Sequence, residues 1–459
     1  MGNHYHMEKK VYRILFAFVV ILSAVFLVGT NADSASGSPY SEFREQAELP
    51  VNEREQLAPP HDGITVVTSH RQGDIVALYP NGTLLYHNGT RDGYWDVDPS
   101  PEGEMTVMYS ATDKVRNSTI CEPVDDQDYC IRQIIERANL STGETTVLYS
   151  RIDPRYHNSE WHDVDRINES HYIVADMYAD EVFIVNVSNG IVTWEWNLQN
   201  HLSLTTGGSY PEDWAHFNDV EVLDDGRIMI SPRNQDQILF IDRKRGVVDD
   251  WTLGTDDRHS ILYEQHNPDY IPRSNGGPAV VIADSENNRI VEFQRTSSGE
   301  WNQTWVWQDR QLQWPRDADR LPNGNTLITD TQGDRVLEVD EQGDIVWSLD
   351  VPVAYEAERL DTGDESTEGA SAERLNLTSR SLASDQASSE QSGILFEIKD
   401  TIKGLFPNKV MNGIGNTTPV WMGFYDLIVS LGGSLTVILW LGLEIKWADF
   451  KLQKPITRG

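Results

Sequence analysis

Short runs of alternating apolar and polar residues repeat along the middle of the chain. The clearest copy occupies residues 219–231, 237–242 and 246–251, and a Gly turn at Gly226 divides its first two runs. Alternation bounded by Gly, Asn and Asp indicates half-buried antiparallel strands. Four such strands in each copy are typical of one blade of a β-propeller.

Each copy begins with an acidic residue at the start of its first strand. The six starts lie 39 to 67 residues apart, at Asp96, Asp163, Asp219, Asp269, Asp317 and Glu356. No strands follow Glu356, whereas three strands without a first partner occur at 64–68, 74–78 and 83–86. We therefore expect a C-terminal inner strand to complete the N-terminal blade, which closes the ring without an open edge. The sequence predicts an all-β, six-bladed β-propeller over residues 60–360.

Two apolar stretches flank the repeats. Residues 11–30 follow Lys9 and Lys10 and are either a signal sequence or a transmembrane anchor, since the small residues at 31–35 would permit cleavage. Residues 420–443 are long enough to span a bilayer as a helix and precede further basic residues. Basic flanks at both stretches predict a protein of the cell membrane, with both ends inside and the propeller on the extracellular side.

Two segments separate the repeats from the second apolar stretch. Residues 361–393 are rich in Ser, Glu, Asp and Gly without apolar periodicity, which predicts a disordered acidic linker. Residues 394–410 have apolar residues at helical spacing with lysines between them. We expect an amphipathic helix there, lying either on the membrane surface or on the propeller.

Charge narrows the range of partners. The 459-residue chain has 72 acidic and 37 basic residues, a formal net charge of −35. Nucleic acid is therefore not an expected partner, because phosphate contacts need clustered cations. Between residues 31 and 393 the only lysines are Lys114 and Lys244. A lysine-poor acidic surface resembles that of halophilic proteins, and an ordinary acidic extracellular protein is the alternative.

Cysteines and sequons also bear on the location. The only cysteines, Cys121 and Cys130, lie in an insertion within the longest repeat interval. Two thiols without a nearby third ligand favour a disulfide over a zinc site. Asn-x-Ser/Thr triplets, which also arise by chance, agree with an extracellular glycoprotein. They begin at Asn81, Asn88, Asn117, Asn139, Asn168, Asn186, Asn302, Asn376 and Asn416.

Candidate chemistry recurs just ahead of the acidic starts. His162, His216 and His266 stand there in three successive copies, and Arg316 takes this place in the fourth. Blades begin with their innermost strand, so these side chains are expected at one mouth of the central channel, near Arg233 from a neighbouring loop. In so acidic a chain they would form a local cationic site that suits a small anion.

A structural role is the alternative for each of these residues. A single imidazole near a strand start commonly only donates or accepts a hydrogen bond, but three in successive blades favour a shared site. The acidic residues recur in nearly every blade, and this favours a turn or strand-start role for them.

These residues resemble the active-site pattern of the arylsulfotransferase family, and the resemblance covers most of residues 60–360. Together with the halophilic composition and the apolar ends, it indicates a haloarchaeal, membrane-anchored type. The residues that carry it are His162 with Asp163, His216 with Asn218 and Arg233, and 251–254 leading to Gln265 and His266.

The resemblance implies an arylsulfate sulfotransferase. Such enzymes move a sulfuryl group from an aryl sulfate ester to a phenolic or other hydroxyl acceptor through a sulfohistidine. The family's nucleophile corresponds to His266, with His162, His216, Asn218 and Arg233 as its partners. No phosphate-cradling glycine loop is evident, and we expect no nucleotide, metal or other cofactor in this site.

The residue types suit this chemistry. Neutral imidazole is a competent nucleophile, and a second histidine can carry the proton of the leaving group. Asn218, Arg233 and Arg316 are the expected substrate-binding residues, because amide and guanidinium donors can hold sulfuryl oxygens.

Departures from the family keep other functions open. The chain leaves little room for the separate N-terminal β-domain of the better-known bacterial enzymes and carries a C-terminal apolar stretch, so donor and acceptor stay unassigned. One rival is a non-catalytic extracellular propeller that binds a ligand or partner protein. The other is a metal or quinone enzyme, since clustered histidines can ligate a metal.

Overall fold

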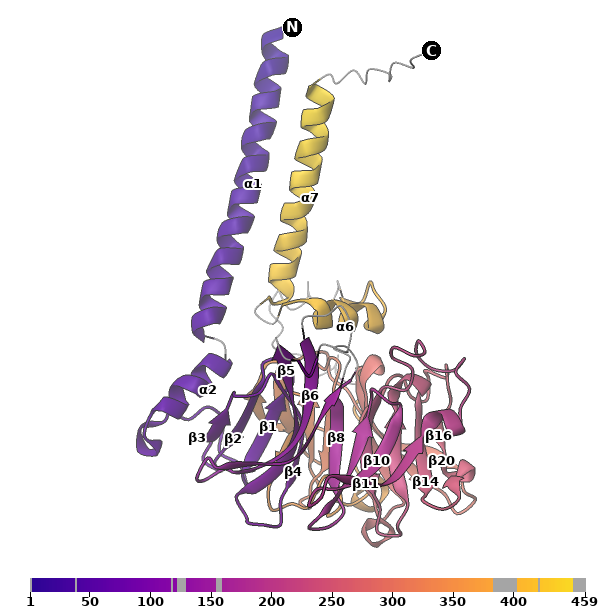
Figure 1. Cartoon of the computed structure of the whole chain (residues 1–459). Coiled ribbons are helices and arrows are strands. Elements are labelled where there is room, and N and C mark those ends of the chain that lie inside the picture. Colours follow the sequence, from indigo (N-terminus) through magenta and orange to yellow (C-terminus); the bar gives the residue numbers. More distant parts are fainter. Residues whose placement is uncertain are drawn as a thin grey trace. The chain divides into compact units, whose positions relative to one another are not determined.

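The computed structural model describes most of the chain as two compact units. The described residues are 2–37, 39–116, 119–121, 129–153, 159–382, 403–419 and 422–448. One unit comprises Met1–Ser41 with Asn416–Gly459, and the other comprises Glu42–Gly415 (Figure 1).

The larger unit is a six-bladed β-propeller, which confirms the predicted fold class. Its sheets are antiparallel and have four strands each, except that one blade carries a fifth short strand. In chain order the first three blades consist of β1 (Thr65–Ser69), β2 (Asp74–Leu78) and β3 (Leu84–Asn88); β4 (Gly93–Pro99), β5 (Thr106–Arg116), β6 (Tyr129–Asn139) and β7 (Thr145–Asp153); and β8 (Trp161–Arg166), β9 (His171–Asp176), β10 (Glu181–Asn186) and β11 (Ile191–Asn197).

The remaining strands form three further blades and the closing strand. They are β12 (Phe217–Val222), β13 (Ile228–Pro232), β14 (Gln237–Asp242), β15 (Gly246–Val247) and β16 (Leu253–Gly254); β17 (His266–Ile271), β18 (Ala279–Asp284), β19 (Arg289–Arg295) and β20 (Trp301–Trp307); β21 (Asp317–Arg320), β22 (Thr326–Asp330), β23 (Arg335–Val339) and β24 (Ile345–Asp350); and β25 (Ala357–Arg359). Short 3-10 helices lie at Val51–Glu53, Leu198–Asn200, Arg233–Gln235, Asp249–Trp251, Arg273–Asn275 and Ser285–Asn287.

The ring closes as the sequence predicts. β25 pairs antiparallel with β1, with Val66 opposite Glu358, and becomes the innermost strand of the blade that β1, β2 and β3 continue. The two ends of the propeller are thus joined in one sheet, which leaves no unpaired inner edge at the junction.

The insertion in the second blade lengthens a hairpin. β5 and β6 pair over their full lengths, from Thr106 opposite Asn139 to Arg116 opposite Tyr129. At the end of this hairpin Cys121 and Cys130 form a disulfide.

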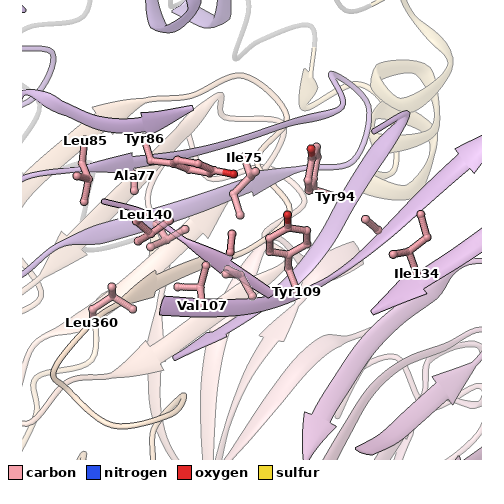
Figure 2. Packing of buried hydrophobic residues seen from close by; sticks show 14 residues of the cluster. Ile75, Ala77, Leu85, Tyr86, Tyr94, Val107, Tyr109, Ile134, Leu140 and Leu360 are labelled. Carbon is pink, nitrogen blue, oxygen red and sulfur yellow. The ribbon is translucent and has the colours of Figure 1, made fainter. Parts of the chain in front are cut away.

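Apolar side chains fill the spaces between neighbouring blades. Figure 2 shows one such cluster, in which Ile75 and Tyr86 of the first blade pack with Tyr94, Val107 and Tyr109 of the second. Full burial of side chains of this size stabilises a fold by about 1.5–3 kcal/mol each. The apolar half of the strand alternation is therefore what holds blade against blade.

Carboxylates connect the inner strands around the central channel. Glu221 of β12 accepts the backbone N–H of Tyr270 in β17 at 2.9 Å, and Glu356 accepts that of Val97 in β4 at 3.1 Å. The other bonds of this kind run from Val164 to Asp96, from Val220 to Asp163 and from Ala357 to Asp317. Four of the six recurrent acids thus have the structural role that their repetition favours.

The segment after β25 differs from the expected disordered linker. Over its described residues, 361–382, the chain packs on the propeller and includes a short helix, α3 (Ala372–Leu375). Ser366 donates to Asp269, and both oxygens of Glu292 accept the N–H of Ala372, at 2.8 and 2.9 Å. Specific polar contacts hold this segment. Such contacts need no regular spacing of apolar residues, so the sequence shows none. Residues 383–393 of the predicted linker lie outside the described residues.

The predicted amphipathic helix, residues 394–410, falls only partly within the described residues. Residues 394–402 lie outside the described part of the chain, and the helix that follows, α6, spans Asn408–Thr417. Met411 and Asn412 of α6 are buried. Helix α6 contacts the propeller, where Asn412 donates to Glu286 (Figure 1).

Helix α2 (Pro39–Glu48) precedes the first blade. Its Phe43 is buried, and its Arg44 pairs with Asp74 of β2 at 2.7 Å. These contacts anchor the chain immediately before it enters the propeller.

The smaller unit contains two long apolar helices, α1 (Gly2–Gly37) and α7 (Phe424–Trp447). Lys9–Gly29 and Phe424–Trp447 are long and apolar enough to cross a membrane. Within this unit Arg13 pairs with Glu444 at 2.6 Å, and Phe16 stacks on Trp440. Both helices are compatible with membrane anchoring.

We expect the inter-blade carboxylates to contribute measurably to stability. Glu221→Ala leaves the part-buried Tyr270 N–H without an acceptor, which costs about 1–3 kcal/mol. Glu221→Gln removes the same charge but keeps an acceptor oxygen, and it should lose less. Denaturant unfolding of both variants measures the difference, and equal stabilities would show that the hydrogen bond is unimportant.

Candidate functional site

The side chains predicted to meet at one channel mouth do come together. His162 lies in β8, His216 directly precedes β12, His266 opens β17 and Arg316 directly precedes β21. All four are buried, His266 completely so. The ring centroids of His162 and His216 are 5.2 Å apart.

Bulges at the starts of the inner strands position these side chains. The strand register shifts between Trp161 and Asp163 in β8, and between His266 and Asp269 in β17. Corresponding shifts occur in β4 and β12. A bulge bends its strand and re-aims the neighbouring side chains. Four blades therefore have a similar bulge at the start of the inner strand, and the residue at the bulge differs from blade to blade.

Hydrogen bonding sets the tautomer of His266. Its Nδ1 lies 2.7 Å from Oγ of Ser285, and this hydroxyl donates to the carbonyl oxygen of Pro315 at 2.7 Å. Because the hydroxyl proton is engaged there, Oγ accepts from Nδ1–H, so the lone pair of the neutral ring is on Nε2. Nε2 is buried and has no hydrogen-bond partner among the described residues.

The surroundings of His266 keep it neutral. Burial lowers the pKa of its imidazole well below the ordinary value, and the positive charges of Arg316 and Arg233 lower it further. Neutral imidazole is the nucleophilic form. Ser285 was absent from the sequence prediction, because it lies 19 residues after His266, at the start of a short 3-10 helix with no distinctive motif.

His216 has a carboxylate partner. Its backbone φ is +51°, a conformation in which few residues other than glycine are found. Its Nδ1 lies 2.6 Å from Oδ1 of Asp213. Burial and the charge of Arg233 lower the pKa of His216, whereas Asp213 raises it. A histidine oriented by a carboxylate in this way is suited to carry a proton.

His162 packs among aromatic rings. Trp95 stacks on it with centroids 4.3 Å apart, and Tyr355 meets it edge-on at 5.4 Å. Burial, followed by the charge of His216, lowers the pKa of His162 well below its ordinary value.

Trp95 and Tyr355 are site residues that the sequence analysis missed. Each stands directly before a recurrent acid, Asp96 or Glu356, as His162 stands before Asp163. Their position directly before a recurrent acid could have identified them. An aromatic residue considered without that position suggests only packing.

Arg316 is a cation of the site with hydrogen-bond donors that no described residue uses. Its guanidinium lies 4.2 Å from the ring centroid of Trp314 and 5.1 Å from that of Tyr355. Within the described structure its Nε and Nη1 are buried and have no hydrogen-bond acceptor. Burial lowers the pKa of Arg316 to about 10. A buried guanidinium with unused donors favours an anionic ligand.

Asn218 and Arg233 already have partners. Nδ2 of Asn218 donates to the backbone oxygen of Gln265 at 2.7 Å, which holds the start of β17. Nε and Nη2 of Arg233 donate to Oδ1 of Asn234 at 3.0 and 2.9 Å, and Nη2 is 3.6 Å from Glu264. Each therefore has a structural bond beside any role towards a ligand.

A polar cavity of about 410 Å³ adjoins this site. Its lining includes Asp213, Arg233, Tyr263, Glu264 and Lys409. Asp213 also bonds His216, so the cavity reaches the edge of the histidine cluster.

Helix α6 contributes Lys409 to this cavity and contacts several blades. Lys409 pairs with Glu264, close before His266 in the chain, and Asn412 donates to Glu286, next to Ser285, at 3.0 Å. The carbonyl oxygens of Asn412 and Gly415 accept from Gln332 and Arg71. Helix α6 thus lies over loops that flank the buried imidazoles.

One family model matches the part of the chain that carries the three histidines. A family model described as arylsulfotransferase (ASST) matches residues 162–276, a segment that begins at His162 and extends past His266. This match supports a sulfotransferase-like function acting on small molecules. No curated protein matches the chain.

Solved structures give weak likenesses to the propeller. A Bacteroides caccae protein of unknown function has 12% identity and a TM-score of 0.43, covering 65% of this chain and 99% of that one. A periplasmic gluconolactonase from Pseudomonas aeruginosa has 11% identity and a TM-score of 0.41, covering 66% of this chain and 99% of that one. Virginiamycin B lyase from Staphylococcus aureus has 12% identity and a TM-score of 0.39, covering 65% of this chain and 86% of that one. Likenesses at this level carry no conclusion about function.

We expect Asn412 to hold α6 on the propeller. Asn412→Ala removes the donor to Glu286, so amide hydrogen exchange in α6 should become faster while the propeller strands stay protected. Val410→Ala, at an exposed position of the same helix, is the matched control and should leave exchange unchanged. Unchanged exchange in Asn412→Ala would show that other contacts hold α6.

Proposed function

We propose that this protein is a sulfotransferase that moves a sulfuryl group from an aryl sulfate ester to a phenolic or other hydroxyl acceptor through a sulfohistidine at His266. The carrying observation is the imidazole of His266, whose Nε2 has a free lone pair, is completely buried and has no partner among the described residues. The match to the arylsulfotransferase model over residues 162–276 supports the same reaction class.

Two displacements account for the transfer. In the first, Nε2 of His266 attacks sulfur, the bond from sulfur to the aryl oxygen breaks, and the departing oxygen takes a proton from a protonated histidine. In the second, the acceptor hydroxyl loses its proton to that histidine as its oxygen attacks sulfur, and the N–S bond breaks. His216 suits the proton-carrying role because Asp213 orients it, and His162 is the second candidate.

The cationic side chains would hold the sulfuryl oxygens. Arg316 has two buried nitrogen donors without acceptors among the described residues, so it can bind oxygen without breaking another bond. Arg233 would exchange its bonds to Asn234 for bonds to the substrate, and Asn218 has a second amide hydrogen beside its bond to Gln265. Such donors stabilise charge that shifts onto the oxygens in the transition state. No nucleotide enters this scheme.

We further propose that the propeller faces the extracellular side of the cell membrane. The basic residues flanking the apolar stretches support this orientation. The net charge of −35 supports a halophilic protein, so activity is best assayed in concentrated salt. Glycosylation at the sequons is expected on the same grounds.

His266→Ala should abolish transfer from 4-nitrophenyl sulfate to a phenol, because the only proposed nucleophile is removed. The assay follows 4-nitrophenolate release and the sulfated acceptor, and mass spectrometry of rapidly quenched wild type should find acid-labile sulfate on His266. Full activity of a folded His266→Ala variant would refute the mechanism. A folded wild type that is inactive with several donors and acceptors would favour a ligand-binding propeller.

Asp213→Asn should lower kcat/KM by about 10²–10⁴-fold, because His216 loses the carboxylate that orients it. Asp213 also raises the pKa of His216, which must be protonated in the first displacement, so its removal should move the alkaline limb of the pH–rate profile for the donor to lower pH. Asp256→Asn, in the same cavity, is the control and should change neither quantity. An unshifted profile with lowered kcat/KM would assign Asp213 to substrate binding instead.

A further inference from the structure

Buried carboxylates lie one step along the inner strands from the histidine site. Every blade contributes at least one, and the six recurrent acids are less than a tenth exposed: Asp96, Asp163, Asp219, Asp269, Asp317 and Glu356. Some strands add a second acid two residues further on, such as Asp98 in β4. The central channel therefore concentrates negative charge away from water.

Nearby arginines do not balance this charge. Arg320 is engaged by Glu292 of β19 at 3.3 Å, and Arg359 by Glu338 of β23 at 3.0 Å. Both acidic partners belong to strands further from the channel, and two positive charges are too few for the more numerous carboxylates of the inner strands. Ionised carboxylates in a dry interior are costly unless each is paired or coordinates a metal. The channel acids must therefore bind protons or cations.

Three of these acids form a compact group. Asp96, Asp98 and Glu356 each offer a carboxylate oxygen, and the three oxygens lie within 4.8 Å of one another. They come from β4 and from the residue that immediately precedes β25, so the group lies where the closing strand meets the second blade.

A neutral side chain from a third strand reaches the same group. Nδ2 of Asn267 in β17 donates to Oε2 of Glu356 at 3.0 Å, which holds the amide against the carboxylates. Asn267 is 7% exposed, and its Oδ1 is buried without a partner in the described part of the chain. The amide oxygen of Asn267 is uncharged, so repulsion between neighbouring carboxylates does not explain why it lacks a partner. A buried acceptor without a donor calls for a ligand that is electropositive.

We propose that Asp96, Asp98, Glu356 and Asn267 bind a hard divalent cation of the Ca²⁺ type in the central channel. Ca²⁺ takes carboxylate and amide oxygens, and water can complete its six to eight ligands. The ion would tie β4 and β17 to the residue that leads into β25, and so would stabilise the closed ring. This site is separate from the proposed sulfuryl transfer, because none of its four residues takes part in that reaction.

Calcium binding to the full-length protein in detergent tests the proposal. The protein is stripped with EGTA in constant concentrated KCl and titrated with CaCl₂ by calorimetry, and its thermal unfolding is followed in parallel. We expect saturable binding and a Tm higher by about 5 °C or more at saturation, because the ion binds only the folded ring. Folded protein that shows neither binding nor a shift would overturn the site.

Three variants separate a built site from general charge relief. Asp98→Asn should abolish the Ca²⁺-dependent Tm shift. Asn267→Gly should weaken Ca²⁺ binding by about tenfold or more, and glycine tolerates the φ of +32° at this position. Asp319→Asn is the control, because Asp319 belongs to a different carboxylate group with Asp269 and Asp317. It should retain the full Ca²⁺ response.

Two outcomes with these variants would overturn the proposed calcium site. A Ca²⁺ response that persists in Asp98→Asn and Asn267→Gly would mean that no ion occupies this group. Equal loss in Asp319→Asn and Asp98→Asn would indicate diffuse attraction of counterions to the whole channel, and it would overturn a specific site. If Asp98→Asn does not fold, Asn267→Gly decides alone, since it removes only a neutral amide.

Discussion

The hydrogen bond from the backbone N–H of one inner strand to a carboxylate of the preceding blade is the interaction on which this ring depends. Val164, Tyr270 and Val97 donate such bonds to Asp96, Glu221 and Glu356. Inner strands of a propeller splay apart at the axis, where they cannot pair as one sheet, so side-chain acceptors satisfy the N–H groups that would otherwise be buried and unpaired. The cost is a concentration of acids in the channel.

This constraint also places the candidate chemistry. Once an acid is required at each strand start, the residue just before it lies at the channel mouth, and its identity is free to serve another purpose. Trp95, His162, Arg316 and Tyr355 all occupy that place. A layer of imidazole, guanidinium and aromatic groups thus adjoins an acidic layer within one repeat.

Local patterns were sufficient to predict the architecture but insufficient for its finest contacts. Strand alternation, turn residues and the acid at Glu356 without following strands predicted six blades and their closure, because each is a property of neighbouring residues. The packed segment 361–382 was missed since Ser366 and Glu292 hold it through single polar contacts that have no period. Ser285 was missed for a similar reason: only the fold brings it to His266.

Complete burial of His266 is consistent with transfer rather than hydrolysis, although at first sight it conflicts with catalysis. A sulfohistidine must meet an acceptor hydroxyl before water, so a transferase benefits from a nucleophile that is enclosed between turnovers. Helix α6 rests on Glu264 and Glu286, the neighbours of Gln265 and Ser285, through an exposed ion pair of Lys409 and a buried hydrogen bond of Asn412. Enclosure also removes water from around Arg316, which strengthens its attraction for an anion.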